Sequence, residues 1–433
     1  MLRKGIIRRA LVFCTILTAT IAAVIKVSDR VSPALFELPV VEAQTNHYFQ
    51  GMQSQFVSHI QNIHTHAASL VELGDGRIRA FWFAGSREGA SDVEIRSAVL
   101  DPVSNRWGAE QSIVNRVKTQ QLLLRYVKKI GNPVAHRAKN GTLWLFYVTV
   151  SIGGWAGSSI TAITSDDDGA SWSAARRLIT SPFLNISTLV KGTPFNYSDG
   201  SIGLPVYHEF IGKFGELLRI SEAGEIIDKS RLSYGKYGLQ PVMLISSQYR
   251  AIALMRHSGA SPKRVVATTT EDAGQRWSPA IKTVLANPDA AISGVVLPDG
   301  RFLIALNNTE HGREVMSLAI SSDNGVTWTN KYQLEDQRGD LLEPASYSRV
   351  AAELAKAADK SIANPVNYGL SAQRNKCEAQ KCGFEFSYPY LIQTRSGDFH
   401  LVYTWNRSFI KHLRFTRVWL ESQLRKTADA QFH

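Results

Sequence analysis

The sequence predicts an all-β fold, a six-bladed β-propeller that takes up most of the 433 residues. Two observations predict it: one turn motif occurs three times, and six candidate β-hairpins follow one another along the chain. Six units of about fifty residues would use most of the chain as a single domain. The composition, with 44% hydrophobic and 20% charged residues, provides enough apolar side chains for a core.

The first 26 residues differ from the rest of the chain, because basic residues precede an uncharged apolar run at 10–25, as in a secretory leader. No convincing small-residue cleavage site follows, so we expect an uncleaved N-terminal hydrophobic anchor helix, with a cleaved signal peptide as the alternative. The bulk of the chain is then exported, to the periplasmic or cell-surface face of the cytoplasmic membrane. We expect four regions: a signal or membrane anchor at 1–26, a stalk at 27–60, the propeller at 61–415 and a C-terminal tail at 416–433.

The recurring turn motif is Ser/Thr-x-Asp-x-Gly-x-x-Trp, at 165–173, 270–278 and 321–329. Its Asp can accept hydrogen bonds from N–H groups of its own turn, its Gly suits a positive φ, and its Trp can pack beneath the hairpin. The first two motifs are 105 residues apart and the last two are 51 apart, which predicts one unit without an intact motif between the first two. A metal or catalytic role for these acids is disfavoured, because the neighbouring acidic positions vary among the three copies.

Six segments each consist of an apolar run, a polar turn and a second apolar run, as β-hairpins do. They are 67–85, 131–150, 185–209, 238–259, 293–308 and 388–405. Each would supply the inner part of one blade. Two further segments predict helices: 346–365, where Ala, Leu and Lys recur at helical spacing, and the C-terminal 416–430.

The cysteines bear on the cellular compartment of the protein, and the net charge bears on the class of its binding partner. Cys14 lies in the N-terminal apolar run, whereas Cys377 and Cys382 could form a disulfide in an oxidising compartment or could remain idle thiols. The net charge of +12 suits nucleic acid, anionic lipid or an acidic glycan. No nucleic-acid-binding module is recognisable and the cations are scattered, so we expect an acidic glycan as partner and no nucleic acid. We expect neither a metal nor a cofactor.

Several phrases resemble the sialidase (neuraminidase) superfamily, in particular its BNR-repeat "predicted neuraminidase" branch, over roughly residues 60 to 415. They are HTHAASLVELGDGRIRAFWFAGSREGASDVEI at 64–95, GNPVAHRAKNGTLWLFY at 131–147, LPVYHEF at 204–210 and EFSYPYLIQTRSGDFHLVYTW at 385–405. The three turn motifs match the Asp boxes of that family. The resemblance implies a sialidase-like propeller and an exo-acting glycoside hydrolase that removes a terminal acidic sugar.

The resemblance also implies roles for individual residues. Sialidases bind a sugar carboxylate with three arginines, protonate the leaving oxygen with an Asp, and use a Tyr that a Glu activates. Here it implies Asp92 as the general acid/base and Tyr388 as the nucleophile, with Glu88 on the same loop as a possible substitute for Asp92. Carboxylate binding would come from three arginines, Arg87, Arg256 and Arg313, which we expect to converge at one end of the propeller axis.

Two positions depart from the family pattern. The segment IHTHAAS replaces the one that would supply the first arginine, and puts His66 near that place. Gln240 stands where the activating Glu is expected, and an amide cannot accept the proton of the tyrosine. Glu209 and Glu385 are then the candidate bases.

The same departures leave two other functions open. A lyase acting on uronic acid polymers would use an arginine to neutralise the carboxylate and His or Tyr as base and acid, for which His66, His208, Tyr207 and Tyr388 are the candidates. A glycan-binding propeller without catalysis would keep the arginines and need no base. In structural terms, Asp92 could instead cap a turn, and Tyr388 and the histidines could be core residues.

Overall fold

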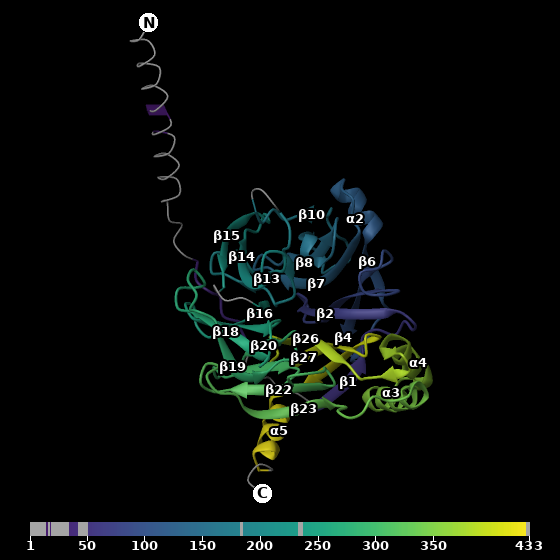
Figure 1. Cartoon of the computed structure of the whole chain (residues 1–433). Coiled ribbons are helices and arrows are strands. Elements are labelled where there is room, and N and C mark those ends of the chain that lie inside the picture. Colours follow the sequence, from purple (N-terminus) through teal and green to yellow (C-terminus); the bar gives the residue numbers. More distant parts are fainter. Residues whose placement is uncertain are drawn as a thin grey trace.

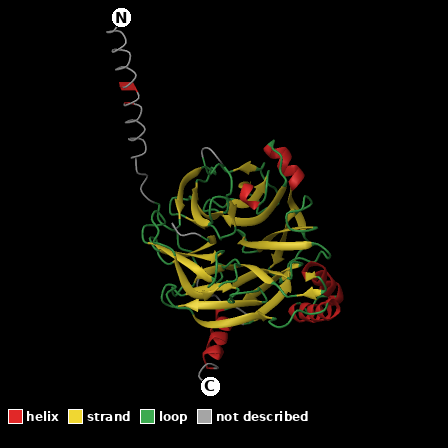
Figure 2. Cartoon of the chain, in the orientation of Figure 1, coloured by secondary structure: helices red, strands yellow, loops and turns green. Residues whose placement is uncertain are grey.

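The computed structural model describes residues 14–15, 18, 34–41, 51–181, 185–232 and 237–429. Six antiparallel sheets of four or five strands form a ring around a common centre, and one two-stranded hairpin lies outside them (Figures 1 and 2). The predicted six-bladed propeller is confirmed. The predicted anchor helix at 1–26 lies outside the described residues, apart from 14–15 and 18. Among the residues that are described, no helix combines the length and the apolar character needed to cross a bilayer.

Each blade runs from an inner strand at the centre to an outer strand at the periphery. The inner strands are β2 (His64–Glu72), β7 (Lys129–Arg137), β11 (Leu189–Val190) with β12 (Phe195–Asn196), β16 (Gly238–Ile245), β20 (Ser293–Val296) and β26 (Phe386–Gln393). The second strands are β3 (Ile78–Gly85), β8 (Leu143–Val150), β13 (Ile202–His208), β17 (Ala251–His257), β21 (Phe302–Leu306) and β27 (Phe399–Trp405). All six predicted hairpins are these pairs of inner and second strands.

The third and outer strands complete the blades. The third strands are β4 (Glu94–Asp101), β9 (Ser158–Ser165), β14 (Phe214–Ile220), β18 (Arg264–Thr270), β22 (Val315–Ser321) and β28 (Phe409–Phe415). The outer strands are β5 (Arg106–Trp107) and β6 (Gln111–Asn115), β10 (Arg176–Arg177), β15 (Ile226–Arg231), β19 (Ile281–Ala286), β23 (Thr329–Asp336) and β1 (Met52–Phe56). Second strands such as β8 are buried at every position, because neighbouring blades cover both faces of the sheet.

The last blade combines both ends of the chain. Strand β1 pairs antiparallel with β28, from Met52 opposite Phe415 to Phe56 opposite Lys411. The segment 34–41 also packs on the ring, since Phe36 is buried and its ring centroid lies 5.4 Å from that of Tyr197. Parts of the stalk expected at 27–60 are therefore built into the propeller, which begins before residue 61.

The three turn motifs have the structural role that the sequence predicts. In the first, Asp167 accepts a hydrogen bond from the Ser171 N–H at 2.8 Å, and Gly169 has a φ of 89°. The other two repeat this geometry between the third and outer strands of their blades, with Asp272 accepting from the Arg276 N–H and Asp323 from the Thr327 N–H, each at 2.9 Å. The blade between the first two motifs lacks one, as the spacing predicts. The Asp boxes therefore fasten blade turns.

Four α-helices lie outside the blades in the described residues. The predicted helix at 346–365 is α3 (Pro344–Ala358), which ends seven residues earlier, and the predicted C-terminal helix is α5 (Arg417–Asp429). Helix α4 (Pro365–Lys376) follows α3 and was not expected. Helix α2 (Arg116–Leu123) and the one-turn η1 (Trp155–Gly157) were not expected. After α4, β24 (Cys377–Glu378) and β25 (Lys381–Cys382) form a hairpin closed by the Cys377–Cys382 disulfide, so that alternative is confirmed.

Candidate active site

Four inner strands carry the same irregularity near their first residues, where the site lies. The strand register shifts in β2, β7, β16 and β26, and one residue at each shift has a positive φ between 45° and 56°. These residues are Ala67, Asn132, Gln240 and Tyr388. A β-bulge inserts an extra residue and changes the direction of its side chain. The bulges bring Asn132, Gln240 and Tyr388, which belong to three different blades, into one hydrogen-bonded group.

The group is centred on two tyrosine hydroxyls. Arg256 Nη1 donates to Tyr388 Oη at 3.1 Å and to Gln240 Oε1 at 3.0 Å. Gln240 Nε2 donates to Tyr388 Oη at 3.2 Å and to Tyr207 Oη at 3.3 Å. Asn132 Nδ2 completes the group with a 3.3 Å hydrogen bond to Tyr207 Oη. Tyr207 from β13, Gln240 from β16 and Tyr388 from β26 therefore meet at the centre of the ring.

The direction of these hydrogen bonds is fixed by Arg256. A guanidinium only donates, so the Gln240 atom that faces it is the oxygen, and the amide nitrogen must face the tyrosines. The oxygen of Tyr388 consequently accepts from both Arg256 and Gln240. The phenolic proton of Tyr388 is used in neither bond and is free to be donated elsewhere.

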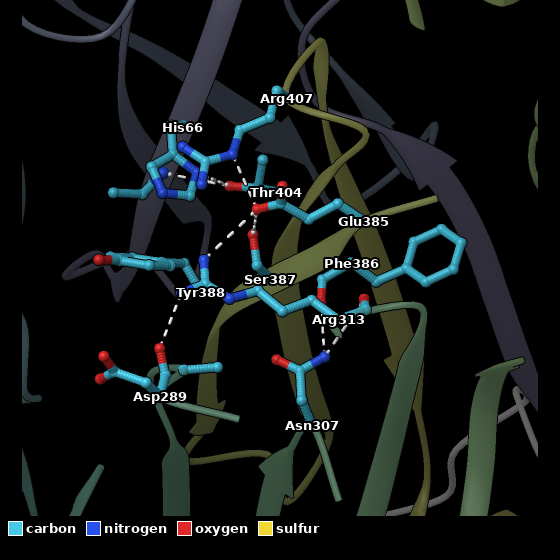
Figure 3. Close-up of polar contacts among 12 residues, drawn as sticks. His66, Asp289, Asn307, Arg313, Glu385, Phe386, Ser387, Tyr388, Thr404 and Arg407 are labelled. Carbon is cyan, nitrogen blue, oxygen red and sulfur yellow. Dashed lines mark hydrogen bonds and ion pairs between the residues drawn. The ribbon is translucent and has the colours of Figure 1, made fainter. Parts of the chain in front are cut away.

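Two of the three expected arginines converge at Asp289. Arg256 Nε lies 2.8 Å from Asp289 Oδ1. Arg313 Nη2 donates to the Asp289 backbone oxygen at 2.7 Å (Figure 3). Burial opposes the charge of Arg256, but the neighbouring Tyr388 and Asp289 raise the pKa of this arginine above its ordinary value. The side chain of Arg256 is only 13% exposed, so this cation is held in the site rather than in solvent.

Glu385 is surrounded by donors. It accepts from Arg407 Nε at 2.7 Å, Ser387 Oγ at 2.7 Å and Arg313 Nη1 at 3.5 Å (Figure 3). It also accepts from Lys376 Nζ at 2.8 Å. Although burial opposes it, the charges of Arg407, Lys376 and Arg313 lower the pKa of Glu385 to about 2. Contrary to the expectation from the sequence, Glu385 is therefore not suited to accept the proton of Tyr388. Its role is to hold three cations at the site.

His66 packs directly against the central tyrosine. The two ring centroids are 4.2 Å apart, and His66 Nδ1 lies 2.8 Å from Thr404 Oγ1. Burial, assisted by the charge of Arg407, lowers the pKa of His66 well below its ordinary value. The pKa of the adjacent His64 is lowered to about 4, again first by burial. Both imidazoles are neutral near pH 7.

The loop between β3 and β4 carries three predicted residues. The carboxylate of Asp92 accepts from the N–H of Ser86 at 3.0 Å and from its hydroxyl at 2.9 Å, so it closes the loop on itself. Glu88 pairs with Arg407 at 2.9 Å, which fastens the loop to the last blade. Arg87 is exposed, and no described residue makes a hydrogen bond or an ion pair with its side chain. Arg87 thus shares no described partner with Arg256 and Arg313.

His208 is the last residue of strand β13 and Glu209 follows it, but the two side chains have different surroundings. Burial raises the pKa of Glu209, although the nearby charge of Arg256 opposes this shift. His208 Nε2 accepts from the N–H of Ile211 at 3.0 Å, and its ring stacks on Phe214 with centroids 4.8 Å apart. Glu209 is thus a carboxylate within electrostatic reach of the site, whereas His208 supports its own loop.

Sequence reasoning missed three cations of the site: Arg407 in the β27–β28 turn, Lys376 at the end of α4, and Lys191 directly after β11. Arg407 and Lys191 each adjoin an apolar strand, where a cation is unusual, and this signal could have identified them. Lys376 gave no comparable signal, because it is the last residue of helix α4 and reaches its partner Glu385 only through the position of that helix. In the described part of the chain, no group of three or more His, Cys, Asp or Glu side chains could hold a metal ion.

Comparisons with known proteins agree with this architecture. The BNR repeat-like domain family matches residues 76–401, and no curated protein matches the chain. A Hadza microbial sialidase is 14% identical, with 82% of this chain and 66% of that one aligned at a TM-score of 0.60. A protein of unknown function from Dyadobacter fermentans is 12% identical over 84% of this chain and 99% of that one, at a TM-score of 0.62.

An intramolecular trans-sialidase from Ruminococcus gnavus, solved in complex with oseltamivir carboxylate, is also 12% identical. The alignment covers 82% of this chain and 94% of that one, at a TM-score of 0.58. At such identities the likeness concerns the fold, which is that of the sialidase-like six-bladed propellers. Because the family match covers most of the ring, the chain belongs to the BNR repeat-like domain family.

Proposed function

We propose that the chain is a sialidase-like glycoside hydrolase that removes a terminal acidic sugar from an extracytoplasmic glycan. The observation that carries the proposal is the Tyr388 hydroxyl, which accepts from Arg256 and Gln240 and keeps its own proton free. An oxygen held by two N–H donors, one of them cationic, is stabilised when negative charge develops on it. This is the requirement for a tyrosine nucleophile, and the fold shared with sialidases supports the same class of reaction.

The cations around Tyr388 would bind the carboxylate of the sugar. Arg256 and Arg313 both reach Asp289, and Arg407 lies next to Arg313 through their shared partner Glu385. Guanidinium groups match a carboxylate in two parallel hydrogen bonds, which gives orientation as well as affinity. We assign Arg407 the place of the arginine that the IHTHAAS segment lacks. Arg87 would contact the substrate from its exposed loop.

In the proposed reaction the Tyr388 oxygen attacks the anomeric carbon of the sugar. The glycosidic C–O bond breaks, and the leaving oxygen takes its proton from Asp92. The phenolic proton passes to Glu209, whose raised pKa suits a group that gains a proton. The charges of Glu209 and Tyr388 both raise the pKa of Tyr207, so the three groups interact electrostatically. Water then cleaves the glycosyl-tyrosine bond with Asp92 as base, Glu209 returns the proton to the Tyr388 oxygen, and the sugar is released with retained configuration.

One observation favours a second candidate function, a β-eliminating uronate lyase. The neutral ring of His66 lies 4.2 Å from that of Tyr388, which places a second proton-transfer group beside the tyrosine. In an elimination the arginines would neutralise the uronate carboxylate, one of the two groups would remove the adjacent C–H proton, and the other would protonate the leaving oxygen. The product then contains a carbon–carbon double bond.

A single pair of assays distinguishes these functions. Hydrolysis releases the fluorophore from a fluorogenic sialoside, whereas elimination produces ultraviolet absorbance on uronate polymers. We expect the first signal, and its loss by a factor of about 100 or more in Tyr388→Phe and Asp92→Asn. Tyr249→Phe and Asp75→Asn are matched controls, because both residues are exposed in turns away from the central tyrosines. Full activity in Tyr388→Phe would contradict the proposal, and an elimination signal would replace it with the lyase.

Export also remains part of the proposal. The Cys377–Cys382 disulfide supports it, since structural disulfides persist in oxidising compartments. We expect an alkaline phosphatase fused after residue 429 to be active in a bacterial host, and to become inactive when residues 1–26 are removed. Equal phosphatase activity without these residues would contradict export through the N-terminal segment.

A further inference from the structure

Lys191 is a buried lysine that crosses the centre of the propeller. It follows β11 in the third blade, and its Nζ donates to the backbone oxygen of Pro389 in the sixth, opposite blade at 3.3 Å. The same Nζ lies 5.8 Å from the ring centroid of Tyr388 and 4.9 Å from that of Tyr390. Lys191 is 3% exposed. Its amine therefore lies beneath the tyrosine that the proposed reaction uses.

This position is unusual because no described carboxylate forms an ion pair with the amine. Burying an ammonium ion without an opposite charge is costly, and lysines are seldom fully buried for that reason. The aromatic rings compensate in part through cation–π attraction. Tyr390 in turn lines a cavity of about 460 Å³ at the far ends of β2, β7 and β26, so Lys191 separates that cavity from the site. A buried amine in such a place suits a functional role better than a structural one.

We propose that Lys191 is a positioning residue of the site, whose ammonium form strengthens the binding of an acidic ligand next to Tyr388. The hydrogen bond to the Pro389 oxygen holds the bulge that aims Tyr388, and the positive charge adds to the field of Arg256 and Arg313. The inference rests on the proposed function, because it assumes an anionic ligand above the tyrosine ring.

Burial lowers the pKa of Lys191 to about 7, so that its charge changes within the physiological range. Desolvation is the only cause of this shift, and no neighbouring charge contributes to it. The titratable groups that face the amine are Tyr388 and Tyr390 from β26 and His66 from β2, whose pKa the charge of Lys191 helps to lower. Anion binding should consequently weaken as the pH rises through 7, because the neutral amine contributes no charge.

The first test measures the lysine itself in the full chain. Lysine labelled with ¹³C at Cε gives one NMR signal per side chain, and the signal absent from Lys191→Arg belongs to Lys191. We expect this signal to titrate near pH 7 without ligand, and the midpoint to rise when sulfate or N-acetylneuraminate binds, since an anion stabilises the ammonium form. A ligand-free midpoint above pH 9, or a midpoint that neither anion raises, would overturn the inference.

The second test measures affinity by calorimetry at pH 6 and pH 8. We expect wild-type affinity for N-acetylneuraminate to fall about tenfold over this range, Lys191→Arg to keep its affinity, and Lys191→Met to bind weakly at both values. Lys128→Met, which removes an exposed cation, should follow the wild type. An unchanged pH profile in Lys191→Met would overturn the inference. A response to sulfate but not to N-acetylneuraminate would support Lys191 and contradict the sugar assigned under the proposed function.

Discussion

A buried histidine pair should make the fold sensitive to acid, and His412 allows the effect to be measured. Trp107 Nε1 donates to His412 Nδ1 at 3.2 Å, and His412 Nε2 lies 3.0 Å from His400 Nδ1. Tryptophan only donates, so His412 must carry its single proton on Nε2 and cannot gain a second one on Nδ1 without losing this bond. Burial, with the charge of Arg414, lowers the pKa of His412 to about 3.

The sign and size of the effect follow from linkage. The pKa of His412 is about 3 in the folded state and 6.5 in the unfolded state, so the unfolded chain binds more protons as the pH falls below 6.5. Between pH 7.5 and 5.5, His412 alone should lower the free energy of unfolding by about 1.4 kcal/mol. The loss deepens with further acidification until the pH reaches the folded-state pKa.

Urea unfolding of wild type and His412→Gln at the two pH values provides the measurement. Glutamine can accept from Trp107 and donate to His400, but it does not titrate. We expect the wild type to lose about 1.4 kcal/mol more than the variant, because the other buried histidines contribute equally to both. His311→Gln, an exposed control, should behave as the wild type does. Equal losses in wild type and His412→Gln would refute the reasoning.

Three further predictions concern the site, the disulfide and the core. Gln240→Met should lower sialoside turnover about tenfold or more in the fluorogenic assay, because it removes one of the two N–H donors to the Tyr388 oxygen; unchanged turnover would count against a tyrosine nucleophile stabilised in this way. Replacing Cys377 and Cys382 by Ser should lower the free energy of unfolding by about 2 kcal/mol for so short a loop, and identical denaturation curves would contradict this. Phe146→Ala, in the fully buried β8, should cost about 3–5 kcal/mol, whereas the exposed Phe210→Ala should leave the urea midpoint nearly unchanged.

The parts of the fold that the sequence predicts are those that neighbouring residues specify. The Asp boxes and the six hairpins each depend on alternation, turn residues and a Gly with positive φ within some twenty residues. Helix α2 escaped because it has no apolar face, and Thr119 is its sole buried residue. Strand β1 was not predicted, because it forms only by pairing with β28, whose residues lie hundreds of positions later in the chain.

The site shows the same division. Tyr388, Gln240 and Arg256 were identified by comparing local phrases with the sialidase pattern that they resemble or depart from, and they do meet. Arg407 and Lys191 were not, because their meaning depends on contacts with Glu88 and Pro389, 319 and 198 residues away. For the same reason, the sequence could not show that Glu385 accepts hydrogen bonds from three cations and a serine. The residue type predicts which bonds a side chain can form, whereas the packing of distant blades around the ring determines which partners it meets.

The pairing of β1 with β28 also sets an order on biosynthesis. A ribosome that has translated the first five blades has released a chain whose N-terminal strand still has no neighbour, since its partner is the last strand to be made. Until then β1 remains unpaired, and an unpaired strand is prone to pair with other chains. A transcript truncated before residue 409 should therefore give an aggregating product rather than a smaller working propeller.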